Sequence, residues 1–570
     1  MDSYSIGSKI TMKLFYNNLG RREKIIFLGT DLLLAMIWTM GMQLSFCGSV
    51  WGTPGENYIK PLDHMTVVHF ILLFILNGLL LLLLIFFNNL YQRYHRKKAE
   101  TDISVPFIKR NRLFYAFSLF CIMAAWLPYV LAYFPGGVYV DTFSSIGSAY
   151  DMDTHGMTLL NNHHPILYTL LWRAVILIGR FFHHSLFFSS GLFLIIQYIV
   201  MASVLAYMIL WIKKRNLNIY ITLALLVFVM FFPLFPLYAI SLWKDTPFSI
   251  ALLLFTLCTA DIIFEKTYDC LKDPRFLMRF FFLGLLVAFT RNNGKYIVFL
   301  VVAILFLSKI RKIFSYKGMA ASFCILAAFI SIIQGPVYDK LNYNIDTVTE
   351  SLGIPLQQLC YLVYYDYTLT EEEIDYLESI VSVESIKEQY RPCIFDSVKW
   401  YAPDFKQDTI QKDPALFLKN YLTIISKHPV GGIKAYLLAT AGFWAPNISG
   451  VEGYAQTWMW ENEYGLKGID YLERFLGFSI QELITQMKPV SSGIFFLFLI
   501  YTEFILLMNR DYRKGILLLP AAANWLTVMA ATPIANSLRY VYIFVLLIPL
   551  EIMLVCTSYK KYQTEGNKIE

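Results

Sequence analysis

Long runs of apolar residues recur along the whole sequence, and they constrain the fold more than any other feature. A helix needs about 20 mostly apolar residues to cross the hydrocarbon core of a bilayer, and about twelve runs approach or reach that length. Hydrophobic residues make up 57% of the 570 residues and charged residues only 16%, against about 25% charged in a typical soluble protein. The sequence therefore predicts an all-α polytopic membrane protein. It excludes a disordered chain, a coiled coil and an ordinary cytosolic enzyme.

We expect about 12 transmembrane helices from these runs. The seventh and eighth runs are short enough to form a tilted or re-entrant pair that meets at Arg291-Asn292-Asn293-Gly294. The predicted spans are residues 25–47, 67–90, 113–134, 186–212, 219–240, 247–264, 276–290, 296–308, 319–334, 494–508, 515–531 and 538–556.

Basic clusters set the expected orientation, because Lys and Arg are enriched in the cytoplasmic loops of membrane proteins. The clusters lie at alternate ends of the predicted spans, and a twelve-span arrangement places all of them on one side. We therefore expect a multi-pass protein of a bacterial plasma membrane with both termini in the cytoplasm. The net charge of +7 follows from these clusters and does not indicate a nucleic-acid partner. The clusters are at residues 21–24, 93–98, 109–112, 213–215, 309–312, 510–514 and 560–561.

Residues 165–182 (PILYTLLWRAVILIGRFF) decide the number of spans. If this segment crossed the membrane, the basic cluster at 213–215 would lie on the outside. Arg173 and Arg180 are seven positions apart and therefore share one face of a helix, as in helices that lie at the membrane interface. We predict an amphipathic or partly buried helix on the outer surface rather than a span.

The order of spans divides the chain into four parts. Residues 1–112 hold an N-terminal cytoplasmic segment and two extra spans, and residues 113–334 form a membrane core whose first outer loop is 135–184. Residues 335–489 are net acidic, unlike the rest of the chain, and predict an inserted, mostly helical extracytoplasmic domain with helices at 370–384 and 414–427. Residues 490–570 hold the C-terminal spans and a short cytoplasmic tail.

The cysteines do not form a motif for a zinc or redox site, because no Cys-x-x-Cys pair occurs. Cys360 and Cys393 both fall in the inserted domain, and they could pair if that domain lies outside the cytoplasm. The other cysteines mostly lie in or beside apolar runs, where Cys behaves as a small hydrophobic residue.

The first outer loop carries the densest group of residue types that perform catalysis. It contains PGGVYVDTFSSIGSAYDMDTHGMTLLNNHHP and begins directly after a span, so we expect Asp141 close to the membrane surface. A carboxylate there could act as general base on an acceptor hydroxyl, and carboxylates with histidines could hold a divalent cation. The alternative is a solvated polar loop. Further candidates for acceptor or metal binding are Asp151, Asp153, His163 and His164.

Three other polar segments interrupt apolar runs, at residues 241–247, 291–296 and 536–540. A cation at membrane depth is costly unless it has a counter-ion or a function, and Lys and Arg are suited to phosphate. The twelve-span arrangement places these segments on the same face as Asp141, which predicts one site for an anionic lipid head group and a hydroxylic acceptor. The alternatives are structural ion pairs and snorkelling cations. The candidates for phosphate binding are Lys244, Asp245, Arg291, Asn292, Lys295, Arg539 and Tyr540.

Three tryptophans of the inserted domain are further candidates for substrate contact. Trp444, Trp458 and Trp460 could stack on sugar rings, because carbohydrate C–H faces pack on aromatic side chains. They could equally belong to the core of the domain.

Over residues 113–556 these motifs resemble the GT-C superfamily of membrane glycosyltransferases, above all an uncharacterised family of bacterial multi-pass proteins grouped with it. The resemblance rests on Asp141 just after a span and on the other polar segments. His163-His164-Pro165 is similar to the HPP-type element of protein mannosyltransferases and lipid A aminoarabinose transferases. The resemblance implies a GT-C-like core with Asp141 as general base and a polyprenyl-phosphate-linked sugar as donor. The implied acceptor is an envelope glycan, a glycolipid or a protein.

The sequence also departs from the GT-C pattern. Asp141 is followed by Thr142 rather than by a second acidic residue, and the histidine element reads HHP. Two extra spans precede the core, and the large outer domain follows the ninth span rather than the last. The donor, the acceptor and any requirement for a divalent cation therefore stay open. Two other hypotheses are a polysaccharide polymerase or ligase and a twelve-span transporter or flippase.

Overall fold

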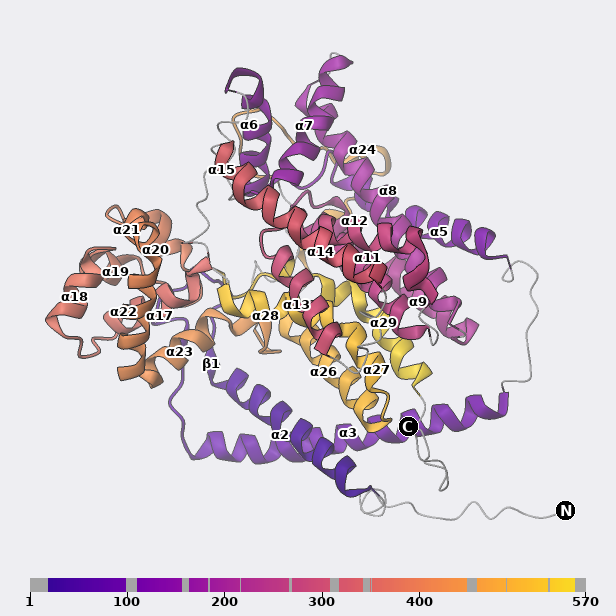
Figure 1. Ribbon diagram of the computed structural model, residues 1–570, viewed down its shortest axis with the longest axis horizontal. Helices are drawn as coiled ribbons and strands as arrows, with labels where there is room; N and C mark the ends of the chain where they lie inside the picture. The colour runs from indigo at the N-terminus through magenta and orange to yellow at the C-terminus, as the bar shows by residue number, and fades with distance from the viewer. Residues whose placement is uncertain are drawn as a thin grey trace.

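A bundle of apolar helices forms the body of the computed structural model, and a group of shorter helices lies at one side of it (Figure 1). Two predicted site residues lie outside the description: His163 and Trp458, together with the side chain of Asp153. The structure describes residues 19–98, 110–155, 164–182, 185–215, 217–265, 269–307, 317–341, 349, 351–448, 459–487, 490–531 and 534–558.

Each predicted apolar segment lies largely on a helix, because a helix satisfies its backbone hydrogen bonds internally and needs no water. The bundle helices are α2 (Arg21–Gln43), α3 (His64–Lys98), α5 (Asn111–Ala132), α8 (Leu186–Lys213), α9 (Ile219–Phe231), α10 (Leu234–Ile240), α11 (Asp245–Phe264), α12 (Pro274–Thr290), α13 (Gly294–Leu307), α14 (Lys317–Ile332), α26 (Ser492–Met508), α28 (Leu519–Ala531) and α29 (Ile543–Thr557).

Eight helices in the described part of the chain are long and apolar enough to cross a membrane. The number is nine if α9 and α10, which are bent by 48° at a break that contains Pro233, form one span. Two further apolar helices, α13 and α26, are shorter than that criterion. These findings establish a polytopic all-α membrane protein, whereas the expected number of about 12 spans exceeds what helix length and hydropathy alone give.

The centre of the bundle is formed by α8, α11 and α29. Their most apolar windows are 61%, 78% and 78% buried, whereas those of α2 and α3 are 33% and 17% buried. In Figure 1 the two N-terminal helices run along the lower edge of the molecule. They are joined by a short antiparallel pair of strands, β1 (Leu44–Ser45) and β2 (Tyr58–Ile59). The two helices α2 and α3 thus lie at the periphery of the bundle.

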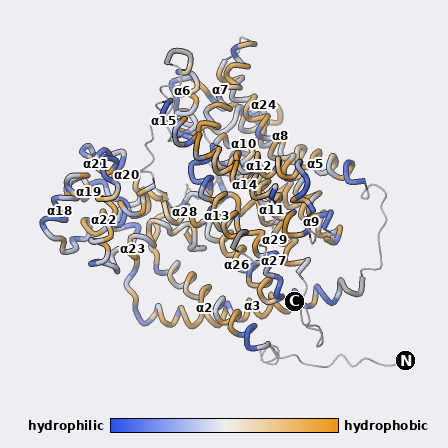
Figure 2. The backbone as a smooth tube through the Cα atoms, in the orientation of Figure 1, coloured by the Kyte–Doolittle hydropathy of each residue, from blue (hydrophilic) through white to orange (hydrophobic). Residues whose placement is uncertain are grey.

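The inserted region is helical, and it is markedly more hydrophilic than the bundle (Figure 2). The helix predicted at 370–384 is two helices, because Ser382 caps a new helix by accepting a hydrogen bond from the Ser385 amide. Cys360 and Cys393 are both buried and free. The helices are α17 (Gly353–Tyr364), α18 (Glu371–Glu378), α19 (Val383–Gln389), α20 (Asp396–Tyr401), α21 (Gln407–Lys412), α22 (Pro414–Lys427), α23 (Pro429–Ala439), α24 (Tyr471–Leu476) and α25 (Ile480–Thr485).

The described part of the first outer loop is largely helical. Its first part is a helix, α6 (Val140–His155), and 166–181 form α7 (Ile166–Phe181). One face of α7 is buried, with Trp172 at its centre, and Leu177 and Ile178 are exposed on the other, as predicted for an amphipathic helix. Arg173 and Arg180 both turn toward α6 rather than away from the protein. Arg173 donates a hydrogen bond to the Ala149 carbonyl, and Arg180 lies over the Tyr150 ring.

Short elements complete the chain. They are η1 (Asp269–Lys272), the π-helix η3 (Ile333–Val337), α15 (Tyr338–Lys340), η4 (Ala441–Phe443), α27 (Tyr512–Gly515), η6 (Ile516–Leu518) and η7 (Leu538–Val541).

Candidate functional site

The ends of several bundle helices meet at the start of α6. After α5 the chain turns through Gly136, whose φ of +110° is a conformation that other residues rarely adopt. Gly137 then pairs in parallel with Ser241, the residue that follows α10. Two backbone hydrogen bonds of 2.9 Å hold this pair, from Gly137 to the Ile240 carbonyl and from Leu242 to the Gly137 carbonyl. This pairing sets the beginning of α6 beside the beginning of α11.

Buried polar side chains fix the short link between α10 and α11. Thr142 and Tyr168 both donate to the Leu242 carbonyl, at 2.6 and 2.5 Å. Gln197 of α8 donates to the carbonyls of Ala239 and Ser241, at 3.0 and 2.8 Å. A buried backbone oxygen without a partner is costly, so these bonds stabilise one conformation of the link. The link carries Lys244 and Asp245.

Asp141 and two cations form the accessible part of the site. The Arg539 Nη1 atom lies 3.1 Å from Asp141 Oδ2, and the Lys244 Nζ atom lies 3.6 Å from the same oxygen. The Asp141 side chain is 30% exposed, whereas those of Lys244 and Arg539 are 13% and 9% exposed. A ligand would therefore meet the carboxylate first, with the two cations behind it.

A second carboxylate lies deeper. The Asp245 side chain is fully buried, with Arg291 Nη1 at 3.2 Å from one of its oxygens and Arg539 Nε at 4.0 Å from the other. It is the first residue of α11, where the helix dipole favours a negative charge. Arg539 thus bridges the two carboxylates. Asp245 holds two guanidinium groups in place beneath Asp141.

His164 adds a neutral polar group to the cluster. Its Nδ1 atom lies 3.2 Å from Lys244 Nζ, and its side chain is buried. An ammonium can only donate, so Nδ1 accepts and the neutral ring carries its proton on Nε2. Burial lowers the pKa of the Lys244 ammonium, and attraction to Asp141 and Asp245 opposes this effect.

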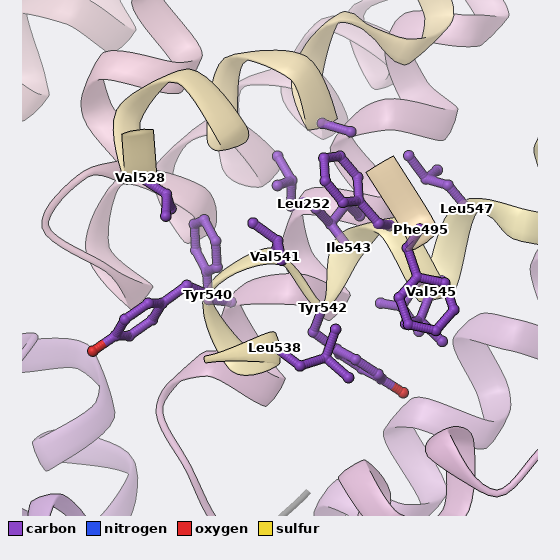
Figure 3. Close-up of a cluster of buried hydrophobic side chains, with 14 of the residues drawn as sticks. Leu252, Phe495, Val528, Leu538, Tyr540, Val541, Tyr542, Ile543, Val545 and Leu547 are labelled. Atoms are coloured by element: carbon purple, nitrogen blue, oxygen red, sulfur yellow. The ribbon is translucent and has the colours of Figure 1, made fainter. Parts of the chain in front are cut away.

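Aromatic rings enclose the guanidinium groups. Arg539 lies 4.8 Å from the Trp243 ring centre, and Arg291 lies 4.5 Å from the ring centre of Tyr540. The Tyr540 hydroxyl accepts a hydrogen bond of 3.1 Å from Arg539. Figure 3 shows the apolar packing around residues 538–547, where the hydroxyls of Tyr540 and Tyr542 point in opposite directions. Cation–π contacts of this kind stabilise a desolvated guanidinium by up to about 2 kcal/mol.

The five residues joined by these ion pairs have a formal excess of positive charge. Lys244, Arg291 and Arg539 supply three positive charges, and Asp141 and Asp245 supply two negative ones. A buried cation needs an anion near it, and the oxygens of a ligand can supply that charge as well as a carboxylate. The site is therefore suited to an added anion, and a guanidinium matches the geometry of a phosphate.

Not every predicted candidate joins the cluster. Asp151 is exposed and lies ten residues further along α6, about 15 Å from Asp141 at the rise of an α-helix. Lys295 lies over the neighbouring Tyr296 ring, at 5.2 Å. Asn292 is partly buried in the turn before α13. Within the described residues, no group of three or more His, Cys, Asp or Glu side chains could hold a metal ion.

Two aromatic residues of the site escaped the sequence analysis. Tyr139 and Trp243 pack with ring centres 4.3 Å apart and ring planes tilted by 38°, and Arg539 lies over the Trp243 ring. Trp243 immediately precedes Lys244, a predicted phosphate contact, so its place in the sequence could have marked it as a site residue. Tyr139 carried no such signal, because its partners are distant in the chain. Asn293, which belongs to the predicted polar segment 291–296, donates a 2.8 Å hydrogen bond to Thr527 of α28.

The inserted domain contacts the segment that carries Arg539. The Gly442 amide donates to the Ala535 carbonyl at 2.8 Å, and the Ala535 amide donates to the Cys393 carbonyl at the same distance. Trp444 is buried and donates to Thr440, so it belongs to the core rather than to a sugar-binding surface. Trp460 is 44% exposed, and its amide donates to the Val138 carbonyl just before α6. Of Trp444 and Trp460, Trp460 is therefore the one exposed enough to meet a substrate.

A comparison with protein families finds one match, a family of unknown function (DUF6020), over residues 148–568. The match includes Lys244, Asp245, Arg291 and Arg539, whereas Asp141 lies seven residues before its start. No curated protein and no solved structure matches the chain. Because the match covers about three quarters of the sequence, the chain belongs to the DUF6020 family of unknown function.

Proposed function

We propose that this protein is a membrane glycosyltransferase that moves a sugar from a polyprenyl-phosphate-linked donor to a cell-envelope acceptor on the outer face of the membrane. One observation carries the proposal: a partly exposed carboxylate, Asp141, lies against the buried cations Lys244 and Arg539 at one end of the bundle. This arrangement pairs a candidate base with a candidate phosphate site. The GT-C-like layout of the sequence and the twelve-span arrangement belong to the same proposal.

The proposed reaction follows from those positions. Asp141 takes the proton of an acceptor hydroxyl, and the oxygen attacks the anomeric carbon of the donor sugar. The bond between that carbon and the phosphate oxygen breaks, and its electron pair leaves with the phosphate. The polyprenyl phosphate gains a negative charge, which Lys244 and Arg539 stabilise. Attack opposite the leaving group inverts the anomeric centre.

Asp245 and Arg291 support the site without meeting the substrate. The fully buried Asp245 holds Arg291 and Arg539 by charge, and both guanidinium groups lie over the Tyr540 ring, at 4.5 and 4.9 Å from its centre. Fixed donors of this kind stabilise charge without reorganising during the reaction. His164 accepts from Lys244 and so directs the ammonium group.

The test measures release of polyprenyl phosphate from a panel of polyprenyl-phosphate-linked sugars. The full-length protein is reconstituted in liposomes with an extract of envelope material as acceptor. We expect Asp141→Asn to lower the rate about 10²- to 10⁴-fold, the usual contribution of a general base. Asp151→Asn is the matched control, because that carboxylate is exposed on the same helix. Equal rates for wild type and Asp141→Asn, in an assay where wild type is active, would exclude Asp141 as the base.

A transporter is the second candidate, and buried acidic residues favour it. Within the described residues, both carboxyl oxygens of Glu551 in α29 and one of Asp31 in α2 are buried without a hydrogen-bond partner. Intramembrane acids often mark ion or substrate pathways. Glu551→Gln separates the two candidates: a glycosyltransferase keeps its transfer rate, whereas a transporter that depends on this carboxyl loses uptake into liposomes.

A further inference from the structure

A cavity of about 760 Å³ lies at the opposite end of the bundle from Asp141. It opens between the C-terminal end of α11 and the N-terminal end of α12. Asp261 in its wall is sixteen residues from Asp245, about 24 Å along α11. The cavity is therefore separate from the candidate glycosyltransferase site. Its lining residues are Lys214, Arg215, Asp261, Phe264, Glu265, Cys270, Asp273, Arg275, Phe276 and Arg279.

The carboxylates of this cavity are already occupied by donors from the protein. Asp261 accepts from Arg215 at 2.6 Å, Arg279 at 2.7 Å and the Trp211 indole at 2.8 Å. Glu265 accepts from a backbone amide at 3.0 Å. A third carboxylate caps α12, since Asp273 accepts from the Arg275 amide at 2.9 Å. A metal ion would have to displace these bonds, so the acidic residues do not make this a cation site.

The basic side chains of the cavity have fewer partners in the protein than its carboxylates. The side chains of Lys214 and Arg275 are exposed, and neither has a hydrogen bond or ion pair with any described residue. The Arg279 side chain is 43% exposed and pairs with Asp261 through one of its nitrogens. The four basic residues of the lining exceed its three acidic ones by one positive charge. The unsatisfied groups of the cavity are therefore donors, which suit the oxygens of a phosphate.

An apolar path leads from the cavity along the bundle. Met278, Phe282 and Leu286 of α12 are 57%, 58% and 41% exposed, and their spacing places them on one face of the helix. Phe264 and Phe276 form part of the cavity wall. A soluble phosphate ester has no acyl chain that could contact these apolar side chains. An acyl chain would lie along it.

We propose that the cavity binds the phosphate of an anionic phospholipid, with Lys214 and Arg275 as its principal contacts. The acyl chains lie along the exposed face of α12. Basic pockets between membrane helices are known to bind such head groups on the cytoplasmic side, where the basic cluster 213–215 is expected. The proposal concerns a different end of the molecule from the glycosyltransferase site, so either one can fail without the other.

The test is native mass spectrometry of the full chain in a neutral detergent, titrated with phosphatidylglycerol, phosphatidylcholine or glycerol phosphate. Wild type is expected to retain phosphatidylglycerol most strongly. Each basic residue near an anionic lipid contributes about 1 kcal/mol, so Lys214→Gln with Arg275→Gln should weaken its affinity about thirty-fold. Lys272→Gln is the matched control, because Lys272 is an exposed neighbour that pairs with Asp269 and does not line the cavity.

Three outcomes would overturn the proposal. Equal phosphatidylglycerol affinity in wild type and the double variant would exclude the two cations as contacts. Equal retention of phosphatidylcholine by wild type would exclude selection by negative charge. Binding of glycerol phosphate as tight as that of phosphatidylglycerol would exclude a lipid as the occupant. The single variant Arg275→Gln should give an intermediate affinity, and its elution on size exclusion checks that the fold is unchanged.

Discussion

Asp141 and Asp245 both contact the Arg539 guanidinium, but their surroundings assign them different tasks. Asp141 is partly exposed, so a substrate can reach its oxygens. Asp245 is fully buried, and Arg291 and Arg539 both lie within 4.0 Å of its oxygens. A carboxylate that can be reached is a candidate base. One that cannot be reached is a candidate anchor for the cations around it.

Asp245→Asn is expected to destabilise the whole protein. Removing one partner of a buried ion pair leaves an uncompensated charge and costs about 3–5 kcal/mol. Thermal unfolding of the purified protein in detergent should show a clearly lower melting temperature. Asp269→Asn is the control, because its pair with Lys272 is more than half exposed on both sides and should contribute less than about 1 kcal/mol. Melting of Asp245→Asn at the wild-type temperature would contradict the role of anchor.

Part of this cluster was predictable from single residues. Cations placed between apolar runs need counter-ions, and the sequence offered Asp141 and Asp245 as the nearest acids. Which acid pairs with which cation was not predictable, because Arg539 meets Asp141 across almost 400 positions of sequence. The aromatic enclosure by Trp243 and Tyr540 is likewise a tertiary feature.

At the level of elements, the connection between α12 and α13 positions Arg291. Gly294 begins α13, and its backbone approaches Val287 of α12 so closely that a Cβ atom would overlap the Val287 carbonyl. The Gly294 amide also donates to the Arg291 carbonyl at 2.9 Å. A residue without a side chain is therefore required at this turn.

Gly294→Ala is expected to lower the melting temperature and to weaken the site. The overlap involves backbone atoms, which cannot move aside like a flexible side chain, so the cost is at least about 1–3 kcal/mol. Gly29→Ala in α2 is the control, because a Cβ atom there meets nothing within 4 Å. That change should be neutral or slightly stabilising, since Ala favours a helix over Gly. Equal melting of the two variants would show that the α12–α13 contact is looser than described.

A second element-level prediction concerns acid stability of the inserted domain. Burial acts to raise the pKa of Asp404, but hydrogen bonds from Ser382 and Ser385 outweigh it and lower that pKa to about 2. The Ser382 amide, at the start of α19, donates to this carboxylate at 2.8 Å. The unfolded value is about 3.9, so the stabilisation is complete above about pH 4 and is lost as the pH falls toward 2.

The measurement is the difference in melting temperature between wild type and Asp404→Asn as a function of pH. Wild type should melt higher at neutral pH, and the difference should shrink between about pH 4 and pH 2. A difference that stays constant across that range would show that the ionised carboxylate of Asp404 does not stabilise the domain.

Helices were predictable to the extent that their residues carried an apolar pattern. Every predicted apolar segment lies on a helix, and α22 has the predicted bounds. The helix α6 was not predicted, because its first turns are Ser- and Gly-rich and show no helical periodicity. The break between α18 and α19 depends on Asp404, a partner from outside both helices. Such tertiary partners are not visible in a local pattern.

At the scale of the whole molecule, the polar residues gather at two ends of the same helices. One end of α11 carries Lys244 and Asp245, and the other carries Asp261 among Arg215 and Arg279. The two basic clusters are expected on opposite faces of the membrane, one facing a sugar donor and the other a phospholipid. Each provides a control for the other, because both are suited to phosphate and they lie at opposite ends of α11.

The most direct test of the proposed glycosyltransferase site is binding of a polyprenyl phosphate, the leaving group of the proposed reaction. Native mass spectrometry compares it with the polyprenol of equal length, which lacks the phosphate. We expect wild type and Arg275→Gln to prefer the phosphate, and Arg539→Gln to lose most of that preference, since a charge-assisted contact contributes about 1.5–3 kcal/mol. Equal binding of polyprenol and polyprenyl phosphate by wild type, or an unchanged preference in Arg539→Gln, would contradict a phosphate site between Lys244 and Arg539.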